Sequence, residues 1–164
     1  MNFEAKVTHI NNQAIILIPA SVDYKLPSRG LVMGSVQIDD ERFILPLEPS
    51  GYQGHWFYVP DNYSNDVFLK ISIEVSEIWI EPHLNEDIKL ALTHNHLLST
   101  WQDLTVKARW EWFRWIRFTK NPNTRSKRIN TMISMLNDQK RRPCCFDHSR
   151  CTDMKVSKGG KLLI

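Results

Sequence analysis

The sequence lacks a long apolar segment. Its longest purely apolar run is Ala14–Ile18, and Pro19 follows directly. A helix needs about 20 apolar residues to cross a membrane, so no membrane span is expected. The N-terminus lacks the basic and then apolar pattern of a secretory signal peptide. The three cysteines, an odd number, do not predict the disulfide framework of a small secreted protein. We therefore expect a cytoplasmic protein.

Motifs of catalysis and cofactor binding are also missing. The chain has no Gly-rich phosphate loop, no nucleophile elbow and no metal-binding His-Glu helix. Serine, histidine and aspartate are scattered without a spacing that predicts a triad, although triads are defined by geometry rather than by sequence order. We expect a protein that is not an enzyme and that uses no cofactor.

The composition is that of an ordinary folded protein. Of the 164 residues, 42% are hydrophobic and 24% are charged, with 8 Pro and 6 Gly. These values exclude a disordered, collagen-like or low-complexity chain. A chain of this length buries roughly 70% of its unfolded surface, so its core needs no disulfide or metal. The length fits one domain or two small ones.

Charge is distributed unevenly along the chain. Residues 1–82 contain 5 Lys or Arg and 11 Asp or Glu, a net charge of −6, whereas residues 83–164 contain 16 and 7, a net charge of +9. Such asymmetry indicates that the second half meets an anion or that the two halves attract each other. A solvated basic surface is the third explanation, because charge alone does not determine fold.

Residues 1–82 show the pattern of short strands. Asn11-Asn12 is a two-residue turn signal between two apolar runs, and Asp39–Glu41 is a second polar turn. Pro19–Leu26 predicts one helical turn. Short strands at this spacing predict a small antiparallel β-barrel. The expected strands are 3–10, 13–18, 31–38, 42–47, 55–59 and 67–80.

Residues 83–142 show helical periodicity. Thr100 and Asp103 form a plausible N-cap pair for a second helix that runs to about Phe118, and Asn121-Pro122 predicts the start of a third. The apolar stripe of the first helix is Leu84, Ile88, Ala91 and Leu92; that of the third is Ile129, Met132, Ile133 and Leu136.

The predicted fold class is therefore α+β, with three segments. A small β-barrel domain spans residues 1–82, and a basic three-helix region spans residues 83–142. Residues 143–164 are expected to form an irregular, cysteine-containing tail, in which Gly159-Gly160 is held loosely.

A family resemblance begins in the helical region. It rests on Trp115-Ile116, Lys120, Thr124-Arg125, Arg128-Ile129 and Leu136. This string resembles the C-terminal segment of the bacteriocin-protection family, also called YdeI/OmpD-associated. The first half is similar to the small β-barrel domain of unknown function that often precedes that segment, through Phe3, Pro19-Ala20, Arg29-Gly30, Val36, Leu47, Pro49, Gly51 and Gly54-His55.

The resemblance implies a barrel followed by helices, and a bacterial protein with a protection phenotype rather than an enzymatic activity. The chain departs from the pattern at two places. Asn65-Asp66 stands where the barrel domain usually has a Gly-Asp turn, and the cysteine-bearing tail lies outside the pattern.

Arg125 and Arg128 border the apolar stripe of the third predicted helix, whereas Lys127 points away from it. The forked donors of a guanidinium suit a carboxylate or a phosphate, so the pair is a candidate binding site. The alternative, which we favour, is an ion pair that joins the helices to the acidic barrel, because paired arginines commonly connect elements.

The second predicted helix carries aromatic residues on two faces. Trp110, Arg114 and Arg117 share the second face, and with Lys120 and the arginines of the third helix they resemble the interleaved aromatic and basic residues that bind single-stranded nucleic acid. Burial of both faces is the favoured alternative, because a helix that is apolar on two sides is normally covered on both.

Two further groups of residues are candidate sites. Cys144, Cys145, His148 and Cys151 offer soft ligands for zinc, but one short loop would have to supply all of them, so we favour thiols without a metal. In the predicted strand at residues 55–59, His55 or Tyr58 could line a ligand site at the barrel mouth, although ordinary packing is favoured.

Two functional hypotheses remain. The first is a non-enzymatic bacteriocin- or stress-protection protein that binds an unidentified protein or small molecule. The alternative is a nucleic-acid-binding module built from Trp110, Arg114, Arg117, Lys120, Arg125 and Arg128. Salt dependence separates them, because binding through phosphates weakens steeply with salt.

Overall fold

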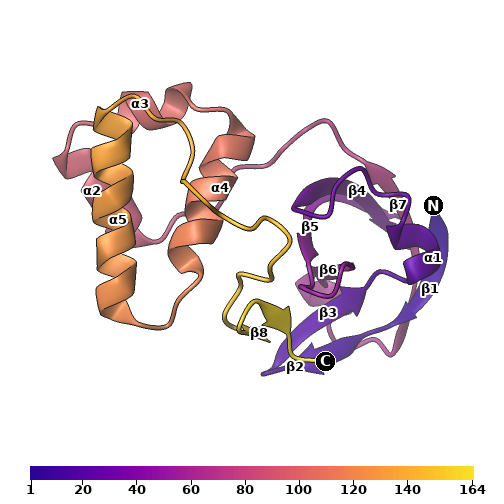
Figure 1. The fold of residues 1–164 in the computed structure, drawn as a ribbon. Coiled ribbons are helices and arrows are strands. Elements are labelled where there is room, and N and C mark those ends of the chain that lie inside the picture. Colours follow the sequence, from indigo (N-terminus) through magenta and orange to yellow (C-terminus); the bar gives the residue numbers. More distant parts are fainter. The chain divides into compact units, whose positions relative to one another are not determined.

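The computed structural model describes residues 1–164, and its elements separate into two units (Figure 1). Residues 1–80, 148–151 and 155–164 form the barrel unit. Residues 81–147 and 152–154 form the helical unit.

Seven antiparallel strands build the barrel unit, in the spatial order β1-β7-β4-β5-β6-β3-β2. Val7 alone separates β1 from β2, yet β1 pairs with β7 and β2 pairs with β3. The two ends of the sheet are thus consecutive pieces of one chain segment, and the sheet is nearly closed into a barrel. The strands are β1 (Asn2–Lys6), β2 (Thr8–Ile10), β3 (Gln13–Leu17), β4 (Val32–Ile38), β5 (Glu41–Pro49), β6 (His55–Tyr58) and β7 (Phe68–Val75).

The predicted barrel and its opening hairpin are confirmed. Asn11 and Asn12 have φ values of 47° and 65°, as the type I′ turn between β2 and β3 requires. Two short helical turns complete this unit, α1 (Ala20–Asp23) and the 3₁₀ turn η1 (Asp61–Tyr63). The barrel interior buries, among others, Ile16, Val36, Ile38, Leu47, Phe57 and Ile73.

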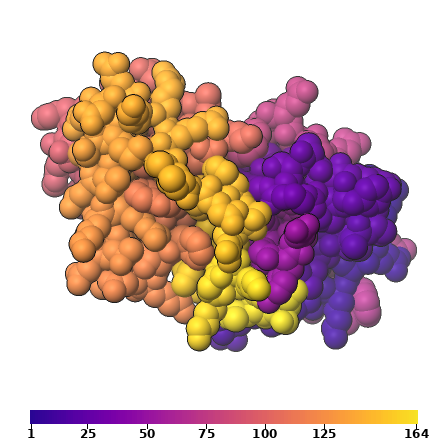
Figure 2. Space-filling model, in the orientation of Figure 1, coloured from indigo at the N-terminus to yellow at the C-terminus, as the bar shows by residue number.

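The end of the chain differs from the irregular tail expected from the sequence. Strands β8 (Ser157–Lys158) and β9 (Lys161–Leu162) form a small hairpin. The amide of Leu162 donates to the carbonyl of Ser50 at 2.8 Å. In Figure 2 the final residues, in yellow, lie against the barrel residues in indigo and magenta.

The reason for this packing is the alternation of side chains along the strands. Ile16 and Phe57 point into the barrel, so their neighbours Ile15 and Trp56 point outward. The tail covers that outer apolar face with three buried side chains, Cys151, Val156 and Leu162.

The helical unit has four helices rather than the three expected. They are α2 (Glu86–His94), α3 (Leu98–Asp103), α4 (Val106–Arg117) and α5 (Pro122–Asn137). The predicted second helix is interrupted between Asp103 and Val106 and forms α3 and α4. The Thr105 hydroxyl accepts a hydrogen bond from the Ala108 amide at 3.1 Å and caps α4. The predicted start of α5 is confirmed, since the Asn121 side chain accepts from the amides of Asn123 and Thr124.

The core of the helical unit joins all four helices. It contains Ile88, Leu92, Leu97, Trp101, Leu104, Ala108, Trp112, Ile116, Ile129, Met132 and Leu136. No helix combines the length and the apolar character that crossing a membrane would require.

Candidate functional site

Arg125 forms an ion pair with Asp87 of α2. Its Nε and one terminal nitrogen lie 2.6 and 2.9 Å from the two carboxylate oxygens, and the Asn85 side chain also accepts from the guanidinium. The Arg125 side chain hydrogen-bonds Asp87 and thereby holds the pKa of that carboxyl below its usual value. The sequence suggested an ion pair with the barrel; the partner is instead a carboxylate of the same unit, so this arginine joins α5 to α2.

The Asp87 pair makes the stability of the helical unit dependent on pH. Because the folded pKa of Asp87 is lowered, its contribution is present above the unfolded pKa of about 3.9 and is lost as pH falls through the folded pKa. We expect Arg125→Gln to lower the free energy of unfolding by about 0.5–1 kcal/mol at neutral pH, the value of a partly exposed pair. Denaturant titrations at several pH values would measure it, with Lys127→Gln as the exposed control. If the stability difference between Arg125→Gln and the wild type does not shrink in acid, the Asp87 ion pair is not its cause.

Arg128 closes the C-terminal end of α4. Its guanidinium donates to the carbonyls of Trp115 and Phe118 at 2.9 and 2.7 Å and lies 5.6 Å from the centre of the Trp115 ring. Carbonyls at a helix end lack partners within the helix, and a cation there is favoured by the helix dipole. Burial lowers the pKa of the Arg128 guanidinium. This arginine therefore stabilises the junction of α4 and α5.

Trp110 and Arg114, the centre of the predicted nucleic-acid surface, are both buried. Their exposed fractions are 6% and 1%. The Trp110 ring packs edge-on against Phe113, and the Arg114 guanidinium lies 5.3 Å from the centre of the Phe146 ring. Neither side chain is placed to stack on a base or to meet a phosphate from solvent.

Arg117 and Lys120 complete the predicted set. The Arg117 Nε donates to the Thr152 hydroxyl at 3.0 Å, and its guanidinium lies 3.7 Å from the Asp153 carboxylate. Lys120 is exposed. Five of the six residues proposed from sequence are thus engaged in contacts within the chain, and they do not form one exposed surface.

The cysteines do not assemble a zinc site. Cys144 and Cys145 are exposed, whereas Cys151 is fully buried in the apolar cluster between the barrel and its tail. No group of three or more His, Cys, Asp or Glu side chains is arranged to hold a metal ion.

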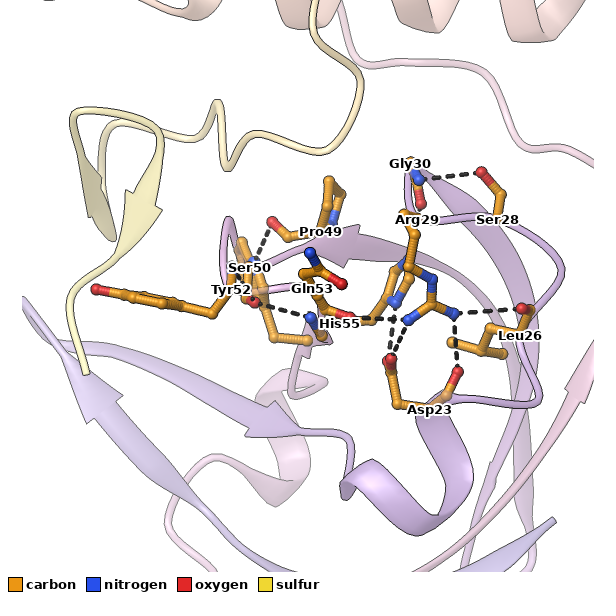
Figure 3. Close-up of polar contacts among 12 residues, drawn as sticks. Asp23, Leu26, Ser28, Arg29, Gly30, Pro49, Ser50, Tyr52, Gln53 and His55 are labelled. Carbon is orange, nitrogen blue, oxygen red and sulfur yellow. Dashed lines mark hydrogen bonds and ion pairs between the residues drawn. The ribbon is translucent and has the colours of Figure 1, made fainter.

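A largely buried polar network joins α1 to the barrel, and two of its three members, Asp23 and Arg29, were not predicted as site residues. His55 Nδ1 lies 2.8 Å from one oxygen of Asp23, and Arg29 binds the other oxygen (Figure 3). Arg29 also donates to the backbone carbonyls of Asp23, Leu26 and Gln53. We call Asp23, Arg29 and His55 the Asp23 network. No local pattern marks it, because α1 and β6 are distant in sequence.

The geometry of His55 determines what this network can do chemically. The second ring nitrogen, Nε2, lies 2.7 Å from the carbonyl oxygen of Gly30. Both ring nitrogens are therefore occupied, one by an oxygen of Asp23 and the other by the Gly30 carbonyl. Ser50 is near in sequence, but its hydroxyl accepts from the amides of Tyr52 and Gly54. His55 has no free nitrogen with which to activate that hydroxyl, so the three do not form a triad.

Two depressions lie on the barrel unit. One, of about 590 Å³, includes Tyr58, the strand residue expected near the barrel mouth, together with His9, Asp61 and Lys155. The other, of about 1050 Å³, sets Glu4, Asp39 and Asp40 against Lys70. Neither lining has an excess of cations, since acidic side chains equal or outnumber the Lys and Arg side chains in both.

A third depression lies in the helical unit, and its lining contains more cations than carboxylates. It has a volume of about 390 Å³, within the range of roughly 300–1,000 Å³ typical of small-molecule sites. We call it the α3–α5 groove. It is lined by Leu97, Thr100, Asp103, Leu104, Leu136, Asn137, Gln139, Lys140 and Arg141.

The end of α5 determines the shape of this groove. Gln139 has a φ of 63°, and the amides of Gln139 and Lys140 donate to the carbonyls of Leu136 and Met135. This is the Schellman motif, which reverses the chain after a helix. Lys140 and Arg141 are thereby turned to the groove rather than continuing along the axis of α5.

Both the side chain and the backbone of Arg141 form hydrogen bonds within the helical unit. Its guanidinium donates to the carbonyl of Asp103 at 3.3 Å, and its own carbonyl accepts from the Trp112 indole at 3.0 Å. The three leucines beneath the rim are at most 5% exposed. The groove therefore combines a floor of buried leucines with two cations on a fixed turn and one carboxylate, that of Asp103.

The comparisons with known proteins concern the helical unit. Residues 81–139 match the model of the family described as bacteriocin-protection, YdeI or OmpD-associated. The match confirms the resemblance proposed from sequence for this segment, which holds α2 to α5 and includes Arg125 and Arg128. Comparison of the chain with curated proteins and with solved structures gave no match.

Proposed function

We propose that this chain, whose residues 81–139 match the bacteriocin-protection family, is a non-enzymatic protection protein that binds a small amphipathic anion in the α3–α5 groove. The observation that carries the proposal is the lining of that groove. Its leucine floor suits an apolar body, and Lys140 and Arg141, which outnumber the single carboxylate of Asp103, suit an anionic head.

The family residues support this location indirectly. Arg125 pairs with Asp87, and Arg128 binds carbonyls at the end of α4, so both are used to hold the helices together. The helices that they join carry the groove at the opposite end of α5.

The nucleic-acid alternative has less support. A surface of that kind requires exposed aromatic rings and arginines, but Trp110 and Arg114 are buried. Arg117 already faces the carboxylate of Asp153. Most of the arginines of these helices contact other groups of the same chain.

The test uses anilinonaphthalene sulfonate as the probe, because it joins an apolar ring system to one anion. We expect saturable binding to the wild-type chain and a loss of about 10-fold or more in affinity for Lys140→Ala/Arg141→Ala, since each charge-assisted contact contributes roughly 1.5–3 kcal/mol. The matched control, Lys120→Ala/Lys127→Ala, removes two exposed cations elsewhere in the same unit and should bind as the wild type does.

The methyl resonances of Leu97, Leu104 and Leu136 locate the bound probe. Chemical-shift changes confined to these leucines support binding of the probe in the groove. Absence of saturable binding, or an equal loss in both double variants, overturns the proposal, since an equal loss indicates attraction to net charge alone. Circular dichroism of each variant excludes binding to a loosened core.

A further inference from the structure

The loop that follows the α3–α5 groove contains two adjacent cysteines. Cys144 and Cys145 are both exposed free thiols, and their sulfur atoms lie 3.0 Å apart. Cys145 has a φ of 58°, a left-handed conformation that is uncommon outside glycine. The backbone therefore presents both thiols to solvent on neighbouring residues, close enough to act on one target.

A disulfide between these two residues is disfavoured. Consecutive Cα atoms are about 3.8 Å apart across a trans peptide, below the roughly 4.4–6.8 Å that disulfides usually span. A bond formed against that limit is strained, and strained, exposed disulfides are readily reduced. The hydrogen bond between the two thiols also raises the pKa of the Cys144 thiol. The resting pair is a dithiol.

We propose that Cys144 and Cys145 form a two-sulfur site for trivalent arsenic carrying one organic group. Such an arsenical has two hydroxyls to exchange. Each thiol forms an arsenic–sulfur bond, each arsenic–oxygen bond breaks, and each thiol proton leaves with a hydroxyl as water. No electrons are transferred, so the step needs no oxidant.

The number and softness of the ligands favour this element over zinc. Structural zinc is almost always held by four ligands, but no third His, Cys, Asp or Glu is arranged beside the pair. Thiolates select soft ions. Binding the second sulfur is an intramolecular event, which strengthens attachment by about 10²–10⁴-fold over one thiol.

Phenylarsine oxide is the probe for the test, used with the full chain under reducing conditions in a monothiol buffer. We expect one adduct per chain by intact mass, accompanied by protection of two thiols from alkylation and reversed by a small dithiol. Cys144→Ser and Cys145→Ser should each weaken binding by about 100-fold or more. The control Cys151→Ser removes the buried cysteine and should keep full affinity.

Two results would overturn the site. One is binding that is lost equally in all three cysteine variants or in none. The other is a wild-type chain that forms the Cys144–Cys145 disulfide and takes up no arsenical. Because the groove is tested with anilinonaphthalene sulfonate on the lysine and arginine variants, and this site with the arsenical on the cysteine variants, failure of one is distinguishable from failure of the other.

Discussion

Asp23→Asn is expected to lower the free energy of unfolding of the barrel unit by about 2–3 kcal/mol, because it weakens charge-assisted hydrogen bonds that each contribute roughly 1.5–3 kcal/mol. The Asp23 carboxylate is nearly buried and accepts from both His55 and Arg29. An asparagine in its place carries no negative charge and offers only one acceptor oxygen. The Arg29 guanidinium would then lose its carboxylate partner, and the His55 ring would face a neutral amide in place of a carboxylate.

Amide hydrogen exchange in β3 and β6 measures this loss within the barrel unit, independently of the helices. The matched control is Asp40→Asn, the same chemical change at an exposed turn, which should alter stability by no more than about 0.5 kcal/mol. If the two variants differ by less than about 1 kcal/mol, the carboxylate does not hold α1 to the barrel.

The second large effect is expected for Gly51→Ala. Gly51 has a φ of 82°, and a Cβ there would lie 2.0 Å from the carbonyl oxygen of Gly160 in the tail. The left-handed backbone alone costs an alanine about 1–2 kcal/mol. The clash falls on backbone atoms that cannot rotate away, so the total loss should be about 3 kcal/mol or more.

Gly159→Ala is the matched control, because Gly159 also has a positive φ, 60°, but a Cβ there meets nothing within 4 Å. Its free energy of unfolding should fall only by the cost of the left-handed backbone, about 1–2 kcal/mol. Besides the free energy of unfolding, the test measures thiol labelling of Cys151 in a Cys144→Ser/Cys145→Ser background. Displacement of the tail should expose Cys151 in Gly51→Ala and leave it protected in Gly159→Ala. Equal labelling would mean that the tail does not depend on this contact.

Local features of the fold were predictable from sequence. The paired asparagines at residues 11 and 12 predicted the first hairpin, and Asn121-Pro122 predicted where α5 begins. Each prediction rests on a backbone preference that acts over a few residues. The family resemblance likewise rested on a short string, and it holds for residues 81–139.

Features that join distant segments were not predictable. The partner of Arg125 is 38 residues away, and that of His55 is 32 residues away, so composition and periodicity contain no information about them. The tail was expected to be irregular because its residues show no period. Its cysteine, valine and leucine are buried only because the outer face of the barrel offers Ile15 and Trp56.

The sequence by itself determined the α+β class, the antiparallel barrel and most helix positions, because hydrophobic period and turn chemistry act locally. Only the tertiary structure decided that Arg125 and Arg128 hold helices together and that Trp110 is buried. It also decided that Leu97, Leu104 and Leu136 form one floor beside Lys140 and Arg141. Burial and ion pairing depend on what the rest of the chain brings to a side chain, and that is set when the elements pack.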